Sequence, residues 1–241
     1  MNKKFLIGIG ILMGTSITGC SKKETSDTII EDISTNPNND TLNKETDTLD
    51  LSSNLNKAKS IYIENEKPLY LDGILVVNKE FSIPKNFASG LAPEVIEAFK
   101  LMKSDAEKEG IILNIRSGFR SYTTQEQLFN TYVQRDGIEK ASRYSAKPGH
   151  SEHETGLAID ITDEFNNRSI GDWFNETEQA KWLYENAYKY GFILRYPESK
   201  EHITGYKYES WHYRYVGIEH SKNFAMNDLT LEEYLKIVPQ E

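Results

Sequence analysis

The sequence predicts an α+β fold with a largely antiparallel sheet, in one domain over residues 61–241. Three observations lead to this prediction. Residues 92–110 carry apolar side chains at helical spacing, and residues 210–217 alternate aromatic and polar side chains with the period of a strand. Helices and strands also follow one another without a regular βαβ rhythm. The roughly 180 residues involved are enough to bury one sizeable core.

The first half of this region predicts two helices around a strand. The helix over 92–110 begins at Pro93, a residue that suits the first turn of a helix. An apolar strand is expected at 111–118. A second helix is expected over 122–137, with Thr124 as its candidate N-cap.

The second half predicts three strands and two helices. A short apolar strand is expected at 156–162, and a helix over 176–191 leads into a strand at 192–197. The alternating segment 210–217 is the third strand. A helix over 230–238 closes the domain.

The first 60 residues differ from the rest. Residues 1–19 combine two lysines, an apolar run of about a dozen residues and small residues, which is the layout of a signal peptide. The ending "SITGC" resembles a bacterial lipobox, so we expect Cys20 to become a lipidated N-terminus; the alternative is an incidental cysteine. Residues 20–60 lack aromatic residues and glycine, and their low hydrophobicity predicts a disordered tether.

Composition excludes several classes of function. The net charge is −9, and no basic patch is present that would neutralise phosphates, so nucleic acid is not an expected partner. Cys20 is the only cysteine. The mature domain is therefore expected to have no disulfide, no thiol nucleophile and no cysteine-rich zinc site.

A metal site is suggested by "SEHETGLAID", residues 151–160, in which His153 precedes Asp160 by seven residues. Catalytic zinc takes three protein ligands and leaves one position open. A carboxylate inside an apolar strand is costly unless it is paired or metal-bound, so Asp160 is informative. His212 is the favoured third ligand because aromatic residues flank it. The other histidines resemble turn or surface residues: His150, His202 and His220.

Three motifs, in order, resemble the zinc D-alanyl-D-alanine carboxypeptidase family of the VanY type, which includes related L,D-carboxypeptidases. Residues 151–160 match S-x-H-x-x-G-x-A-x-D, and 209–217 match E-x-W-H-x-R-Y-V-G. Residues 117–129, "SGFRSYTTQEQLF", match S-G-[FY]-R-S-x-x-x-Q. The resemblance covers about residues 70–235 and implies the small α+β fold shared by Hedgehog and D-Ala-D-Ala peptidases.

The resemblance implies one zinc per chain, held by His153, Asp160 and His212. Glu209 would be the general base that takes a proton from water and returns it to the leaving amine. Residues three apart on a regular strand point to opposite faces. Glu209 is therefore expected to precede the strand that carries His212.

The same resemblance implies a role for Arg120 as the electrophilic partner, which stabilises an oxyanion or grips a carboxylate. Its alternative is a surface salt bridge. Gln125, Ser145 and Ser151 are expected to contact the end of the peptide substrate, although Ser151 could equally brace the turn before His153. Glu154 forms a "His-Glu" pair with His153, but Leu157 breaks the HExxH zinc motif.

Rival enzymes fit less well. A serine D-Ala-D-Ala peptidase needs Ser-x-x-Lys, and "SIPK" at 82–85 matches only formally, because Pro84 disfavours a helical turn and the partner motifs are missing from the sequence. The cysteine count excludes a cysteine L,D-transpeptidase. A non-catalytic cell-wall-binding module of the same fold would have no need of a base such as Glu209.

The expected substrate is the peptidoglycan stem peptide, from which a C-terminal D-alanine would be removed by D,D- or L,D-carboxypeptidase action. The alternatives are a peptidoglycan endopeptidase and a D-Ala-D-Ala dipeptidase. A lipid on Cys20 would hold the protein at the outer face of the cell membrane, in an extracytoplasmic location. The tether over residues 20–60 would let the domain reach away from that surface.

Overall fold

The structure is a computed structural model that describes residues 68–163 and 168–238. The signal peptide predicted at 1–19, the lipidation of Cys20 and the tether at 20–60 lie outside the described residues and stay predictions. Within the described ranges, no helix combines the length and the apolar character needed to cross a bilayer.

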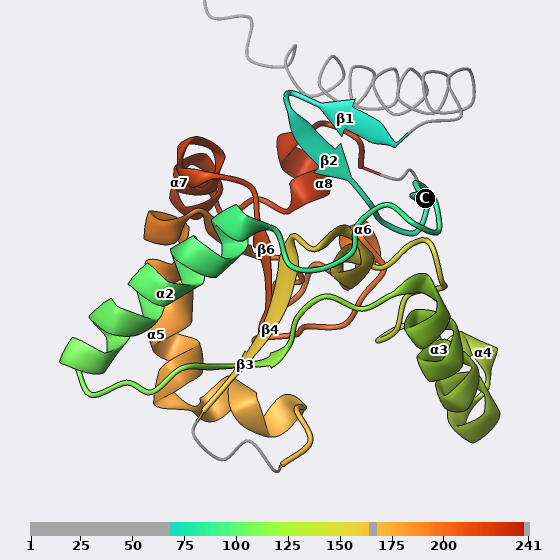
Figure 1. The fold of residues 1–241 in the computed structure, drawn as a ribbon, viewed down its shortest axis with the longest axis horizontal. Helices are drawn as coiled ribbons and strands as arrows, with labels where there is room; N and C mark the ends of the chain where they lie inside the picture. Colours follow the sequence, from blue (N-terminus) through green and yellow to red (C-terminus); the bar gives the residue numbers. More distant parts are fainter. Residues whose placement is uncertain (1–67, 164–167, 239–241) are drawn as a thin grey trace, which may run out of the picture. The chain divides into compact units, whose positions relative to one another are not determined.

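Four short strands form the main sheet (Figure 1). Their spatial order is β3 (Asn114–Ser117), β4 (Ala158–Thr162), β6 (His212–Tyr215) and β5 (Phe192–Leu194). Every neighbouring pair is antiparallel. The predicted α+β class with an antiparallel sheet is therefore confirmed, and each strand is a shorter version of the segment that the sequence indicated.

A separate hairpin precedes this sheet and was not predicted. It pairs β1 (Leu69–Leu71) with β2 (Ile74–Val76) in antiparallel register. The two residues between the strands, Asp72 and Gly73, both have positive φ angles, of 49° and 79°. An Asp-Gly pair in this conformation matches the twist of a two-residue hairpin and keeps its strands in register.

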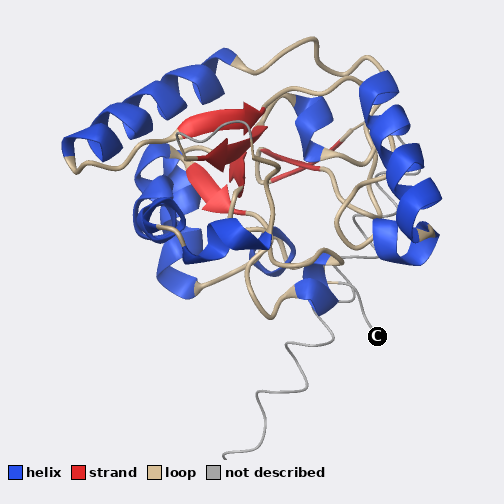
Figure 2. Cartoon of the chain, turned by 90° about the horizontal axis from the view of Figure 1, so that it is seen from below, coloured by secondary structure: helices blue, strands red, loops and turns tan. Residues whose placement is uncertain are grey.

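Helices lie on both sides of the main sheet (Figures 1 and 2). The long helix α2 (Pro93–Lys108) and the helix α5 (Glu178–Asn186) lie on one side of β3 and β4, and α3 (Tyr122–Asp136) with α4 (Ile138–Ala141) lies on the other. The main core joins α2 and α5 to the sheet. Its buried members include Val95, Phe99, Met102, Ile159, Ile161, Trp182, Leu183, Phe192 and Tyr213.

The start of α3 corrects one prediction. Ser121, not Thr124, is the N-cap, and its side chain accepts a hydrogen bond from the backbone N–H of Thr124. Ser121 has extended backbone angles, with φ −66° and ψ 157°, whereas Thr124 already lies within the first helical turn. A cap must sit outside the helix so that its oxygen can reach an unpaired N–H group.

The remaining elements are short. The helix predicted over 176–191 is divided, because α5 gives way to the 3₁₀ helix η3 (Ala187–Tyr190) before Gly191, which has a φ of 90°. The closing helix shrinks to α8 (Leu231–Tyr234). The other short elements are the 3₁₀ helices η1 (Glu152–Thr155) and η2 (Asp172–Glu176) and the helices α6 (Glu201–Thr204) and α7 (Ile218–Asn227).

A second core holds the hairpin against the C-terminal helices. Leu69, Ile74 and Val76 of the hairpin belong to the same buried cluster as Phe224 of α7 and Leu231 of α8. Segments at opposite ends of the described chain are thereby joined. This junction matters for the site, because Glu232 of α8 and the carbonyl of Leu75 in β2 bind two arginines that extend toward the metal centre.

The two faces of β4 and β6 differ sharply. Ile159, Ile161 and Tyr213 point into the main core, whereas Asp160 and His212, which alternate with them, line a cavity on the other face. Side chains alternate between faces along any strand. The sheet therefore presents its polar residues together on the side that faces away from α2 and α5.

Candidate metal centre and active site

Three potential metal ligands meet on the polar face of the sheet. Asp160 of β4 and His212 of β6 are direct partners in the antiparallel register. His153 comes from η1, just before β4, and Gly156, with a φ of 73°, turns the chain between them. One ligand atom from each residue lies within 4.8 Å of the others, and all three residues are buried. The structure thus brings together the three ligands implied by the sequence.

Hydrogen bonds fix which nitrogen of each histidine faces this point. His153 Nδ1 lies 2.7 Å from the carbonyl oxygen of Gly118, so it must carry the proton, and Nε2 faces Asp160 Oδ2 at 3.2 Å. His212 has the opposite orientation: Nδ1 lies 3.0 Å from Asp160 Oδ1, and Nε2 faces away from it. The atoms that face one another at this point are His153 Nε2, the Asp160 carboxylate and His212 Nδ1.

The electrostatics of these residues suit a divalent cation. Burial alone would raise the pKa of Asp160, but the two histidines hold it well below its usual range. Burial alone would likewise lower the pKa of His212, yet its hydrogen bonds to Asp160 and Glu152 raise it to about 9. A bound metal ion would take the place of the protonated histidines as the positive charge beside Asp160. Two histidines and one carboxylate are a donor set of catalytic zinc sites.

Glu209 lies three residues before β6, outside the strand, as expected from the sequence. Its backbone carbonyl accepts a hydrogen bond from the N–H of His212 at 3.1 Å, in the turn that leads into the strand. The side chain lines the same cavity as the three ligands and is 8% exposed. Burial raises the pKa of Glu209 to about 8, with Asp160 adding to the rise and the positive charges of His212 and Arg120 opposing it. A carboxylate so placed can exchange protons near neutral pH.

Arg120 is fixed beside the ligands by two hydrogen bonds. Its Nη1 donates to Gln125 Oε1 at 2.7 Å, and its Nη2 donates to Ser117 Oγ at 2.9 Å. Nη2 also lies 3.9 Å from Asp160 Oδ2. The guanidinium is therefore held at the edge of the metal centre rather than in an ion pair at the surface.

The predicted substrate contacts divide into two kinds. Gln125 is buried and uses its amide within the protein: the oxygen accepts from Arg120, and Nε2 donates to the carbonyl of Ala146 at 2.6 Å and to Ser145 Oγ at 3.4 Å. Gln125 thus positions Arg120 and the following loop. Ser145 and Ser151 line the cavity, and Ser151 also precedes η1 as its N-cap.

Glu154 has a structural part in the same turn. Its two carboxylate oxygens accept from the backbone N–H of Gly149 at 2.9 and 3.1 Å, and one accepts from the N–H of Ser151 at 3.4 Å. These bonds close the loop that presents His153. Glu154 therefore braces η1, and the cavity lining does not include it.

The other histidines lie outside the metal cluster. His150 faces the carbonyl oxygen of Asn78 through Nδ1 at 2.8 Å, and His202 is exposed on α6. His220 is half-buried rather than on the open surface that its sequence context suggested, because it packs against Tyr234, whose hydroxyl lies 2.9 Å from Nδ1. His150 and His220 thus have partners other than Asp160, and the metal cluster among the described residues contains neither of them nor His202.

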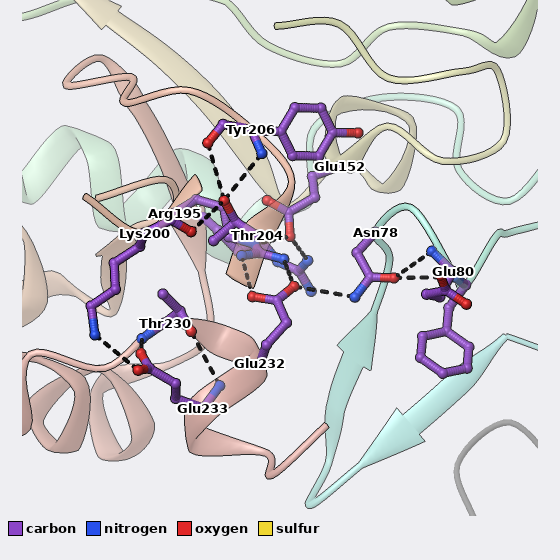
Figure 3. A network of polar contacts seen from close by, with 12 residues as sticks. Asn78, Glu80, Glu152, Arg195, Lys200, Thr204, Tyr206, Thr230, Glu232 and Glu233 are labelled. Carbon is purple, nitrogen blue, oxygen red and sulfur yellow. Dashed lines mark hydrogen bonds and ion pairs between the residues drawn. The ribbon is translucent and has the colours of Figure 1, made fainter. Parts of the chain in front are cut away.

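Glu152 is a site residue that the sequence analysis missed. It is 2% exposed, and its Oε2 lies 3.2 Å from His212 Nε2. Its Oε1 accepts from Arg195 Nε and from Arg214 Nη1, both at 2.8 Å. Figure 3 shows its carboxylate directed toward Arg195. Although burial would raise the pKa of Glu152, the two arginines hold it well below its usual range.

The predicted site residues and Glu152 line one cavity of about 650 Å³. Its lining includes each of the eight predicted metal, catalytic and substrate-contact residues: Arg120, Gln125, Ser145, Ser151, His153, Asp160, Glu209 and His212. A cavity of this size accepts a short peptide end. Three metal-type ligands, a buried carboxylate and a fixed guanidinium in one cavity define the class as a metallopeptidase.

The comparison with known families agrees with this class. Residues 88–218 match the family model described as VanY, D-alanyl-D-alanine carboxypeptidase. This chain belongs to the VanY family. The family resemblance drawn from the three motifs is thereby confirmed.

Individual relatives span both branches of the family. A protein of Bacillus subtilis named putative carboxypeptidase YodJ is 41% identical over 184 residues, which cover 68% of this chain and 67% of that protein. The structure of the LdcB LD-carboxypeptidase is 38% identical, with a TM-score of 0.64, and the match covers 73% of this chain and 95% of that one. A D,D-pentapeptidase VanY structure in complex with Zn(II) is 32% identical, with a TM-score of 0.59, over 67% of this chain and 97% of that one.

Proposed function

We propose that this domain is a zinc-dependent carboxypeptidase that removes one C-terminal D-alanine from peptidoglycan stem peptides. The observation that carries the proposal is the shared cavity, in which His153, Asp160 and His212 lie together with Glu209 and Arg120. The VanY relative that binds Zn(II) supports zinc as the metal. Zinc supplies Lewis acidity, which polarises a carbonyl and lowers the pKa of water to about 7.

Glu209 accounts for both proton transfers. Glu209 accepts a proton from the attacking water and then donates it to the nitrogen of the departing D-alanine. Burial raises the pKa of Glu209 to about 8, so the carboxyl group can take up and release a proton near neutral pH. The same carboxylate can therefore serve first as base and then as acid.

Arg120 binds the negative charge of the substrate. Gln125 and Ser117 hold its guanidinium through two hydrogen bonds, and Arg120 lines the cavity beside the three potential metal ligands. A fixed fork of this kind can grip the terminal carboxylate or the oxyanion that forms during attack. A grip on the terminal carboxylate would select for a free peptide end, and so for carboxypeptidase rather than endopeptidase action.

We further propose that the preferred substrate is the tetrapeptide stem, whose terminal D-alanine follows an L-configured centre. The support is the LdcB LD-carboxypeptidase, which is more similar in sequence and fold than the VanY pentapeptidase, with 38% against 32% identity and TM-scores of 0.64 against 0.59.

A substrate panel tests both proposals. Zinc-loaded protein is offered a stem tetrapeptide, a pentapeptide and free D-Ala-D-Ala, and products are followed by mass. We expect loss of a single D-alanine, fastest from the tetrapeptide. Faster cleavage of the pentapeptide would reverse the preference, cleavage of the dipeptide alone would indicate a dipeptidase, and internal cleavage would indicate an endopeptidase. Stem-peptide binding without any cleavage would support the binding-module alternative.

The location is also a proposal. The lipobox-like ending at Cys20 supports a lipid anchor at the outer face of the cell membrane, with residues 1–19 removed as a signal peptide. Metabolic labelling with a fatty acid should mark the wild-type protein and not Cys20→Ala. A cleaved protein that stays in the membrane fraction without the label would contradict lipidation.

A further inference from the structure

A buried network of charged side chains contacts the metal centre through His212. Figure 3 shows part of it, with Glu152, Arg195 and Glu232. Two carboxylates and two guanidinium groups make it up: Glu152, Glu232, Arg195 and Arg214, each at most 2% exposed. Their formal charges cancel. Burying four charges costs free energy even when they are paired, and apolar residues of similar volume would often stabilise a fold as well. A requirement other than stability is therefore the better explanation of the network.

Within the network, one carboxylate oxygen of Glu152 faces a predicted metal ligand, His212. Glu152 Oε1 accepts from both Arg195 and Arg214, whereas Glu152 Oε2 faces His212 Nε2 at 3.2 Å. The two arginines thus fix the position of Glu152. Glu152 therefore contacts the imidazole of His212 at Nε2, and Nδ1 of the same ring faces Asp160.

The arginines are in turn held from the far side. Arg195 donates two further hydrogen bonds to Glu232 of α8, at 2.9 and 2.6 Å, and Glu232 also accepts from Asn78 Nδ2 at 3.1 Å. Arg214 donates to the carbonyl of Leu75 in β2 at 2.7 Å. The hairpin and the C-terminal helix are therefore tied to the position of Glu152.

We propose that Glu152 is a positioning residue of the metal centre, which accepts the Nε2 proton of His212 and so presents Nδ1 to zinc. A carboxylate behind a metal-bound histidine fixes its tautomer and ring orientation and makes the nitrogen a better donor. For His153, the neutral carbonyl of Gly118 fixes the tautomer and the ring orientation instead. The proposal rests on the metal site of the proposed function and adds a role for the charge behind it.

The test compares two matched substitutions in the network. Glu152→Gln and Glu232→Gln each remove one buried negative charge at nearly constant shape, but only the first alters the group that faces His212. Zinc dissociation constants are measured by chelator competition, and thermal unfolding of the metal-free proteins checks that both fold. We expect the zinc dissociation constant of Glu152→Gln to rise about 10- to 100-fold. That of Glu232→Gln should rise much less, because Arg214 still donates to Glu152 and the carboxylate facing His212 is unchanged.

Two outcomes would overturn the proposal. Wild-type zinc affinity in Glu152→Gln would show that the carboxylate does not act on His212, and equal losses in both variants would show that the network serves only the fold. Failure of the wild-type protein to bind zinc would instead refute the metal site itself, and this inference with it.

A measurement on the unmodified protein keeps the proposal testable if Glu152→Gln does not fold. Long-range proton–nitrogen NMR spectra of the zinc-loaded wild type, with labelled histidine, report which nitrogen of His212 carries a proton. We expect a slowly exchanging proton on Nε2 and metal coordination through Nδ1. Coordination of His212 through Nε2 would contradict the role assigned to Glu152.

Discussion

The two faces of the central sheet are built from alternate residues of the same strands, yet they meet opposite physical demands. On one face, Ile159, Ile161 and Tyr213 pack under α2 and α5. On the other, Asp160 and His212 converge with charged groups around a cavity. A shift of one residue in register would exchange the faces. The apolar face therefore fixes the register on which the metal ligands depend.

The faces should also differ in what they tolerate. Apolar burial contributes roughly 25 cal/mol per Å² without strict geometry, and swaps that conserve volume usually cost less than about 1.5 kcal/mol. Buried charges depend on each partner, and removal of one typically costs about 3–5 kcal/mol. Substitutions on the apolar face should thus change stability, and those on the polar face should change metal binding or chemistry.

The largest expected effect follows loss of a ligand. His212→Ala or His153→Ala should lose both zinc and all carboxypeptidase activity, because two remaining donors cannot hold the ion in place. Metal analysis and D-alanine release measure the two effects. Ile161→Val, on the opposite face of the same sheet, is the control and should keep both. Full zinc content in both alanine variants would refute the ligand assignment.

Loss of the base should separate metal binding from chemistry. Glu209→Gln is expected to keep zinc, because Glu209 is not among the clustered ligands, and to lower turnover by at least about 10²–10⁴-fold. Zinc content and kcat are compared in the same preparation. Near wild-type turnover would mean that another group is the base.

A core truncation should do the reverse. Met102 of α2 is fully buried in the main core, so Met102→Ala should lower the free energy of unfolding by about 2–5 kcal/mol. Chemical denaturation measures this loss. Turnover of the folded protein, assayed well below its melting temperature, should not change. A selective loss of turnover would show that the two faces are not independent.

A smaller, pH-dependent effect is expected in the metal-free protein. Burial raises the pKa of Glu209 to about 8 from a usual value of 4.5, so between these values the native state keeps a proton that the unfolded chain has lost. The contribution of Glu209 to stability is then greatest below pH 4.5 and declines as the pH rises toward 8. Glu209→Gln should flatten this decline. Parallel curves of unfolding free energy against pH for the two proteins would contradict it.

The sequence predicted best what depends on local pattern. Period-two alternation identified the strand of His212, and the isolated carboxylate in an apolar strand identified Asp160. Glu209 was placed before the strand because a residue three positions away would otherwise face the core. These deductions need only the geometry of a strand.

The sequence predicted poorly what depends on distant partners. Glu152 was not singled out, since its partners Arg195 and Arg214 lie 43 and 62 residues further along the chain. One signal was present: Arg214 stands two residues after His212 and so shares its face of the strand. The hairpin of β1 and β2 was missed, although Asp72-Gly73 between apolar residues is a recognisable turn.

The most direct test of the account is a zinc titration of the metal-free protein with D-alanine release as the readout. The chelated protein should be inactive toward the stem tetrapeptide, and activity should rise in proportion to added zinc and level off at one ion per chain. Release of D-alanine by the fully metal-free protein, or folded protein that binds zinc at His153, Asp160 and His212 without releasing any D-alanine, would contradict it.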